Sequence, residues 1–571
     1  MRRRFLNNTY KNISGDISGY IDYFTIEALE DGLTAKLSAN ACEYCVDGGA
    51  WNTLSENTNT ASINKGQILS FRGNLIHNFF DGIGTFTISK KCNLKGNIMS
   101  LLYGDDFIDK TDLTGKDCAF FHLFNYCTKI VDASNLILPA TTLANSCYES
   151  MFEGCTSLIT APELPATTLA GRCYCNMFYG TNVLPDCSNI DFTKHNNGGL
   201  SGLFAGTKVT DNDLYNILPI NPATGNYWLP ATTLEGECYA YMFDGCTSLT
   251  TAPELPATTL TYRCYAYMFE GCTGLTVAPE LPATTLEGEC YAYMFDGCTS
   301  LITAPELPAT TLTYRCYESM FYGTNVLPDC INIDFTKHNN GGLQGLFAGT
   351  KVTDNDLYNI LPINPATGNY WLPATTLKGY DYAYMFEGCT SLTTAPELPA
   401  TTLEVGCYEC MFSGCSKLNY IKMLATDIST IHCLMGWVEY VSETGTFVKH
   451  PDMNTLESGY SGIPSGWTVV DNVESNLITF TITGVEYQAE EGMTWEEWVE
   501  SEYNTLGLIN YEYIDPETGE GLGYGVIRNP IIDKTLGWNC ENTPELSGFG
   551  DEETYSEDEI KPNWNYFYMR W

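Results

Sequence analysis

The middle of the chain repeats one phrase with a period of 26 residues, and this repeat constrains the fold more than any other feature. Residues 238–260 read CYAYMFDGCTSLTTAPELPATTL, and nearly the same phrase returns at 264–286 and at 290–312. The phenylalanine of its M-F-x-G-C motif, or the equivalent residue, can be followed through eleven units from Phe124 to Phe412. A fixed period of this length is typical of a solenoid, because one unit is too small to bury its own apolar face and must stack on its neighbours.

Each unit, called a rung below, predicts three short elements. In CYAYMF the larger side chains are spaced four apart, as in Cys238 and Met242, which favours a short helix that ends at Gly245. The following SLTTAPELP predicts a short strand and a turn, because its prolines forbid a long hydrogen-bonded strand. The residues expected to anchor this segment in the core are Leu249, Leu255 and Leu260.

The sequence divides into three predicted domains. Residues 1–100 lack the repeat and predict an N-terminal β-domain, with strands in YFTIEA, LTAKLS, QILSFRG and IGTFTISK and a turn at VDGGAW. Residues 101–471 hold the repeats and predict the solenoid. Residues 472–571 predict a C-terminal α+β domain, with a hairpin that turns at Thr483-Gly484, a helix capped by Thr494 and a further strand in GEGLGYGVIRNP.

Two intervals in the repeat measure 39 residues instead of 26, as if 13 residues had been inserted. They arise because residues 180–236 recur at 323–379 with three differences, which indicates duplication of a block. Thr210 and Asp213 form a capping pattern ahead of an apolar stripe, so the insert predicts a short helix and a loop on one edge. Protruding loops are natural contact sites, and the insert is therefore either a binding element or a by-product of recombination.

The repeated sequence C-Y-x-x-M-F-x-G-C-T-S-L-T-T-A-P-E-L-P-A-T-T-L resembles the leucine-rich repeat of BspA-like bacterial surface proteins. The resemblance covers about residues 117–470 and is repeated in register. It implies a leucine-rich-repeat solenoid that binds host or matrix proteins and has no enzymatic activity. Proteins of this type are also encoded by phages of gut bacteria, and we expect a Bacteroidales phage as the source because no secretory signal follows MRRRFL.

Most of the 24 cysteines occupy two positions of the rung, as in Cys238 and Cys246. An even count suits a disulfide framework. However, Thr181 and Thr324 replace one of the two cysteines in their rungs, and Asp381 replaces the other. Neither position therefore needs its partner to be cysteine, and we expect reduced thiols in the core.

Metal binding and catalysis have weak support. Cys42-x-x-Cys45 has the spacing of zinc ligands, but no second pair follows at a standard distance, so we expect no metal. The sequence lacks a G-x-S-x-G motif, a phosphate-binding loop, H-E-x-x-H and a dinucleotide fingerprint. We therefore expect no enzyme and no cofactor. An enzyme embedded on the repeats stays a third alternative, which would need a non-repeating pocket that gathers a histidine with acidic partners.

The charge balance excludes two classes of partner. Asp and Glu outnumber Lys and Arg by 69 to 28, which gives a net charge of −41. Such a chain repels nucleic acid and anionic membrane surfaces. No stretch approaches the roughly 20 apolar residues of a membrane span, so we expect no membrane insertion. Basic residues gather only in MRRRFLNNTYKN, which is either a solvated terminus or a segment that docks on an acidic neighbour.

Three columns of equivalent residues are the candidate binding sites. The carboxylates form either a solvated face or a groove for a basic partner or calcium. The tyrosines either pack between rungs or form a row that grips sugar or protein. The first carboxylate column is Glu254, Glu280, Glu306 and Glu397, the second is Asp244, Glu270 and Asp296, and the tyrosines are Tyr241, Tyr267 and Tyr293.

These observations predict a non-catalytic adhesion protein. The most specific version is a fibre or adhesin on a phage virion, which contacts a protein or glycan on the host surface. One terminal domain would mount it on other virion proteins, and it is a candidate homo-oligomer. A BspA-like adhesin on a bacterial cell surface is the alternative.

Overall fold

The structure is a computed structural model, and its residues group into two compact units, Met1–Asp471 and Asn472–Trp571. The second unit is described only through its strands. The described residues of the first unit are 23–38, 42–73, 85–167, 169–193, 198–310, 312–330, 332–336, 341–453 and 458–471.

The first unit begins with a six-stranded sheet in the order β4-β3-β5-β1-β7-β8 and a separate pair, β2 and β6. All four strand segments predicted before residue 91 are confirmed, and VDGGAW holds the β3–β4 turn, where Asp47 and Gly48 have positive φ. The strands are β1 (Phe24–Ala28), β2 (Ala35–Leu37), β3 (Cys42–Val46), β4 (Asn52–Leu54), β5 (Ile68–Arg72), β6 (Phe86–Ile88), β7 (Cys92–Asn97) and β8 (Ile130–Ile137).

This sheet runs directly into the repeats. The strand β8 lies beyond residue 100, where the sequence analysis placed a boundary, and it pairs in parallel with β7. A short helix, α1 (Ser100–Tyr103), and a 3₁₀ turn, η1 (Gly104–Asp106), lie between the two strands. The ring of Phe124, from the first rung, packs 5.6 Å from Phe24 and 5.8 Å from Phe86. The N-terminal strands therefore close one end of the interior that the rungs continue.

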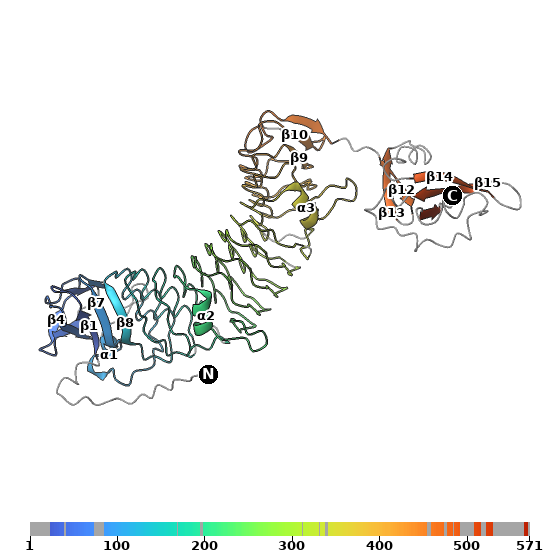
Figure 1. The fold of residues 1–571 in the computed structure, drawn as a ribbon. Helices are drawn as coiled ribbons and strands as arrows, with labels where there is room; N and C mark the ends of the chain where they lie inside the picture. Colours follow the sequence, from blue (N-terminus) through green and yellow to red (C-terminus); the bar gives the residue numbers. More distant parts are fainter. Residues whose placement is uncertain are drawn as a thin grey trace. The chain divides into compact units, whose positions relative to one another are not determined.

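Consecutive rungs lie side by side and share one interior (Figure 1). The phenylalanine rings stack from rung to rung, with centroids 5.6 Å apart for Phe243 and Phe269 and 5.8 Å for Phe269 and Phe295. A second buried column stacks Tyr239, Tyr265 and Tyr291 at 5.8–5.9 Å. One hydrophobic cluster extends from Phe24 to Trp467, so each rung depends on its neighbours for burial.

The helix predicted for each CYAYMF segment is wrong. These residues form a run of hydrogen-bonded turns in which alternate amides donate in two directions. The amides of Tyr239, Tyr241 and Phe243 donate to carbonyls of the next rung at 2.9–3.0 Å, whereas those of Ala240 and Met242 donate to the carbonyl three residues back. Every fourth residue has a left-handed backbone, with φ between 57° and 68° at Tyr241 and Gly245. Side chains spaced four apart therefore share a face without an α-helix.

The need to pair buried backbone amides and carbonyls explains why the CYAYMF segments form turns and no α-helix. An α-helix would direct the amides along its own axis and leave the carbonyls of adjacent rungs without donors in the interior. The turns instead give each rung a row of hydrogen bonds to the next one while keeping the apolar side chains inward. A spacing of four residues between apolar side chains does not distinguish an α-helix from this run of turns, because both bring residues i and i+4 to one face.

Proline decides where the rungs form strands. In the rungs that carry APELP, parallel pairing is reduced to isolated bridges such as Thr251 to Val277 and Thr259 to Thr285. The last three rungs carry YIKM, TFVK and TVVD instead, without proline, and form three parallel strands: β9 (Tyr420–Met423), β10 (Thr446–Lys449) and β11 (Thr468–Asp471). The predicted anchors are confirmed, since Leu249, Leu255 and Leu260 are at most 3% exposed.

The helix predicted in the insert is confirmed in both copies of the block. It is α2 (Asp211–Ile217) in the first copy and α3 (Asp354–Ile360) in the second. Each helix begins with a capping box, in which the Thr210 side chain accepts from the Asp213 amide and Thr353 does the same with Asp356. The labels in Figure 1 show each helix attached to the edge of the stacked rungs.

The second unit contains two groups of antiparallel strands. The predicted hairpin strands are confirmed as β12 (Leu477–Ile482) and β13 (Val485–Glu490), which pair with each other. A second sheet has the order β14-β15-β16 and consists of β14 (Leu508–Ile514), β15 (Gly521–Arg528) and β16 (Asn565–Tyr568). The predicted turn at Thr483-Gly484 and the helix capped by Thr494 lie outside the described residues.

Candidate functional site

The tyrosine row consists of Tyr241, Tyr267 and Tyr293 on three consecutive rungs. Their rings stack face to face, with centroids 4.6 Å and 4.8 Å apart and planes 5° from parallel. All three are partly exposed. The ring faces therefore pack between rungs, and ring edges and hydroxyl groups are what the row offers to a partner. The Tyr293 hydroxyl already donates to Glu318 Oε1 at 3.2 Å.

The backbone under this row is unusual for large side chains. The three tyrosines have φ of 56–60°, a region that non-glycine residues seldom adopt. Other rungs place Gly202 or Gly345 at the equivalent position, where no side chain opposes this conformation. The row is therefore kept at a conformational cost that ring stacking offsets.

The carboxylate row lies three residues further along the same rungs and consists of Asp244, Glu270 and Asp296. Each side chain is partly buried, and among the described residues none donates a hydrogen bond to it. Burial, and secondly the charge of Glu270, raises the pKa of Asp244 to about 7 and that of Asp296 to about 6. Burial also raises the pKa of Glu270. Near neutral pH the row therefore carries less than its full formal charge, and a cationic group beside it would favour ionisation.

The glutamate column, Glu254, Glu280, Glu306 and Glu397, is not the uniform acidic face that its repetition indicates. Asn221 and Asn226 of the first insert donate to the two Glu254 oxygens at 2.5 Å and 2.8 Å. Glu306 accepts from Asn332 at 2.7 Å, while Glu280 is exposed. Glu254 and Glu306 therefore help to hold neighbouring loops in place, as does Glu397, described below.

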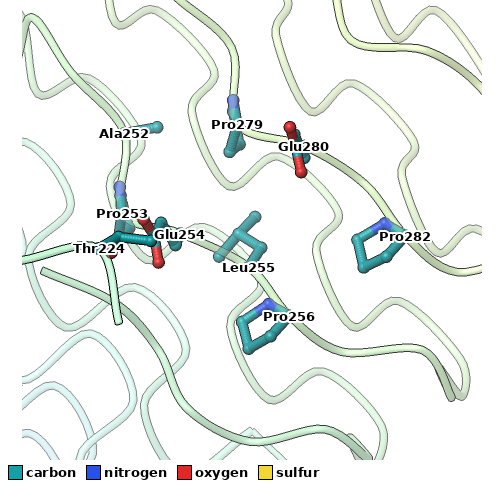
Figure 2. A pocket seen from close by; sticks show the side chains of 9 residues that line it. All are labelled: Thr224, Ala252, Pro253, Glu254, Leu255, Pro256, Pro279, Glu280 and Pro282. Carbon is teal, nitrogen blue, oxygen red and sulfur yellow. The ribbon is translucent and has the colours of Figure 1, made fainter. Parts of the chain in front are cut away.

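Glu254 and Glu280 also line a groove of about 530 Å³ between two rungs. Figure 2 shows Thr224 of the insert beside Glu254 on one side and Pro279, Glu280 and Pro282 of the next rung on the other. The proline rings give this groove rigid apolar walls.

Glu397 has the most complete set of partners in the column. It is 5% exposed and accepts from Asn364 at 2.5 Å, from Thr367 and Asn369 at 3.0 Å, and from Lys422 Nζ at 3.2 Å. These donors lower its pKa, although burial opposes them as the largest single effect. Glu397 therefore connects the second insert to the rung of Lys422 through buried hydrogen bonds.

The sequence analysis missed a column of alternating charge. Residues Glu237, Arg263, Glu289 and Arg315 precede the first cysteine of consecutive rungs, and all four have left-handed backbones. Arg263 Nε lies 2.5 Å from Glu289 Oε2, and Arg315 pairs with Glu318 within its own rung at 3.5 Å. The alternation of GEC with YRC in successive rungs was the available signal. Part of the acidic charge is thus neutralised within the surface.

The cysteines are structural. Every described cysteine is free, and all except Cys410 are buried. Cys272 Sγ donates to the Phe243 carbonyl of the preceding rung at 3.0 Å, and Cys298 repeats this bond with Phe269 at 3.1 Å. Where threonine replaces cysteine, as at Thr181, the hydroxyl donates to the phenylalanine carbonyl of its own rung. The position therefore requires a small donor, which explains why cysteine and threonine interchange there.

The thiols are poorly suited to nucleophilic chemistry. Burial raises the pKa of Cys246 and of Cys298 to about 12, so the reactive thiolate is disfavoured. Cys42 and Cys45 lie in β3 with their side chains buried. Among the described residues, no group of three or more His, Cys, Asp or Glu side chains is arranged to hold a metal ion.

Comparisons with protein-family models, with curated proteins and with solved structures find no match for this chain. In the described part of the chain, no helix is both long and apolar enough to cross a membrane. The described residues form a set of repeated surfaces, of which the tyrosine row with the carboxylate row is the most regular.

Proposed function

We propose that this protein is a non-catalytic binding protein whose repeats form a leucine-rich-repeat-type solenoid. The observation that supports this most directly is the tyrosine row beside the carboxylate row on three consecutive rungs. The rows present phenol hydroxyls and carboxylates at a regular spacing, with no described donor bound to the three carboxylates. Such a surface complements an extended partner that carries basic or hydroxyl groups.

The interior supports the same role. Rung-to-rung hydrogen bonds and stacked rings hold equivalent side chains in register, so the surface is ordered before a partner arrives. Preorganisation of this kind lowers the entropic cost of binding. Burial raises the pKa of the thiols, which makes them poor nucleophiles, and Glu254 and Glu397 are occupied by hydrogen bonds within the chain.

We further propose that the protein is a fibre or adhesin on a phage virion and contacts a protein or glycan on the host cell. This assignment rests on the resemblance of the repeats to those of BspA-like proteins. One terminal region would attach to other virion proteins, and the chain would work as a monomer or a homo-oligomer without nucleic acid or membrane insertion.

Cell binding tests the role of the two rows. The fluorescently labelled full-length chain would be incubated with a panel of intact gut bacteria and measured by flow cytometry. The variant Y241S/Y267S/Y293S uses serine because Ser150 and Ser319 occupy the same left-handed position in other rungs. We expect it to lower labelling of the bound strain by about tenfold, since aromatic side chains dominate binding energies.

A matched control variant is Ile302→Ser, which changes a side chain that is 73% exposed and belongs to neither row. It should label cells as the unaltered chain does. Equal loss in both variants, or no labelled strain, would refute the binding role. Immunogold labelling of purified particles tests the location separately, because label on bacterial envelopes instead of virions would favour the cell-surface alternative.

A further inference from the structure

The second insert helps to form a pocket that takes in one member of the predicted glutamate column, Glu397. It has a volume of about 310 Å³, at the lower end of the range for small-molecule sites. Its walls come from α3, from the insert loop and from the two rungs that follow. The lining residues are Asp354, Tyr358, Asn369, Tyr370, Thr394, Ala395, Glu397 and Tyr420.

An exposed aromatic ring lines the pocket. Tyr358 of α3 is 46% exposed and packs edge-on against Tyr370, with centroids 4.8 Å apart and planes at 90°. Tyr370 is itself buried, and its hydroxyl donates to the Thr394 carbonyl at 2.8 Å. This arrangement fixes the orientation of the Tyr358 ring while leaving much of the ring accessible to a ligand.

The polar groups of the pocket are ordered without a ligand. Asp354 accepts from the Thr393 hydroxyl, from the Thr393 amide at 2.9 Å and from the Thr394 amide at 3.3 Å. Glu397 is held by the insert amides and by Lys422, as described above. Because Lys422 compensates the charge of Glu397, the pocket has less need of a cationic ligand than an open pair of carboxylates would have.

We propose that this pocket is a binding site for a neutral saccharide. A sugar ring presents an apolar face that suits the Tyr358 ring, and its hydroxyl groups can exchange hydrogen bonds with the phenol and amide groups of the lining. The pocket combines these features with a fixed geometry. A basic peptide is the less favoured ligand, because the donors that surround both carboxylates already occupy much of their capacity.

The first insert provides a natural comparison. Tyr215 and Tyr227 repeat the edge-on pair at 4.8 Å, and Tyr215 is 47% exposed. The second rung after this insert, however, supplies Val277 and Pro279 where the second copy has Tyr420 and Lys422. The first copy therefore lacks both the extra phenol and the compensating ammonium group, and we assign the saccharide site to the second copy alone.

The proposal is independent of the tyrosine and carboxylate rows, since none of their members lines the pocket. It is tested with the full-length chain on an array of neutral oligosaccharides, followed by titration of the best-bound glycan. The variants are Tyr358→Ala and, as the matched control, Tyr215→Ala. Both side chains are exposed, so the fold should survive, and thermal melting verifies this.

We expect the unaltered chain to bind at least one neutral glycan, and Tyr358→Ala to weaken this binding by about tenfold or more. Tyr215→Ala should leave the affinity unchanged, and a lysine-rich peptide should not compete. The proposal is overturned if the array retains no protein, if Tyr358→Ala binds as tightly as the unaltered chain, or if Tyr215→Ala causes the loss. Competition by the peptide would overturn the choice of ligand in favour of a basic one. The Y241S/Y267S/Y293S variant should bind the glycan normally, which separates this site from the proposed cell-binding surface.

Discussion

Residues 180–236 and 323–379 are two copies of one block, yet the protein uses them differently. They differ at three positions. Both fold into a capped helix followed by a loop whose asparagines donate hydrogen bonds to a glutamate. In the first copy Glu254 is partly exposed and accepts from two asparagines. In the second copy Glu397 is 5% exposed and also accepts from Lys422. The difference arises largely outside the block, in the second rung after each copy.

The comparison shows that the sequence of the block determines its local structure, whereas residues outside the block determine the charges around its glutamate. The capping box and the edge-on tyrosine pair are encoded within the block, so they are copied with it. The ion pair at Glu397 depends on Lys422, which replaces Pro279 of the consensus rung. Lys422 therefore adds an ion pair to asparagine hydrogen bonds that both copies share.

The largest expected effect comes from removing the two glutamates. Glu397→Ala leaves the Lys422 side chain, which is 13% exposed, without its partner and should destabilise the second insert by about 3 kcal/mol. Glu254→Ala removes an acceptor whose partners are the uncharged amides of Asn221 and Asn226, and it should cost about 1 kcal/mol at the first insert. Hydrogen–deuterium exchange of residues 361–372 and 218–229 measures the two effects locally, as suits a repeat array.

The double variant E397A/K422A is the control for this prediction. It removes both charges and should restore part of the protection lost in Glu397→Ala. Equal exchange in the two single variants would show that the ion pair contributes nothing beyond the shared asparagine bonds.

A smaller effect is expected from the carboxylates that follow each block, Asp244 and its counterpart Glu387. The folded-state pKa of Asp244 is raised to about 7 by burial and by Glu270, so the folded state binds its proton more tightly than the unfolded state. Stability should therefore fall as pH rises from about 4 to 7, and Asp244→Asn should remove this dependence. Because solvent screens a partly exposed carboxylate, we expect a gain of about 1 kcal/mol at pH 8.

The counterpart Glu387→Gln sharpens this comparison. Its pKa is raised by burial alone, since Ser413 stands where the first copy has Glu270. Thermal melts at pH 5 and pH 8 should show a larger pH-dependent gain for Asp244→Asn than for Glu387→Gln. A gain for Asp244→Asn that is the same at both pH values would contradict the assignment.

The smallest effect concerns the buried tyrosine column, whose members Tyr265 and Tyr382 lie beyond the first and the second block. The Tyr265 hydroxyl is buried and has no described hydrogen-bond partner, whereas the Tyr382 hydroxyl donates to the Phe335 carbonyl at 3.3 Å. Tyr265→Phe should thus be neutral or stabilise by up to about 1 kcal/mol, and Tyr382→Phe should cost a similar amount. Urea denaturation compares the two, and an equal loss of stability would indicate that water bonds to the Tyr265 hydroxyl.

Several elements were predictable because their signals are local. The N-terminal strands and the hairpin strands at 477–490 follow from runs of β-formers bounded by turn residues. The insert helix follows from Thr210 and Asp213, since a capping box involves only neighbouring residues. The burial of Leu249, Leu255 and Leu260 follows from their apolar character within a repeat.

The candidate site was less predictable. The sequence identified the tyrosine row as a column, but the ring stacking depends on a rung spacing that only the folded backbone provides. Repetition of Glu254 and Glu397 indicated a shared surface role, although each is bonded to an insert loop more than 25 residues away in the chain. Long-range hydrogen bonds leave no local pattern in a single sequence.

The amino-acid sequence alone determined the period, the inward set of apolar side chains and the positions where proline prevents strands, because these properties belong to residues and their immediate neighbours. Only the tertiary structure decided that CYAYMF becomes a run of turns, because the amides must satisfy carbonyls of the adjoining rung. It also decided which carboxylates are hydrogen-bonded, which are buried and which are exposed, since the ionisation of a carboxylate depends on the groups that lie beside it in the fold.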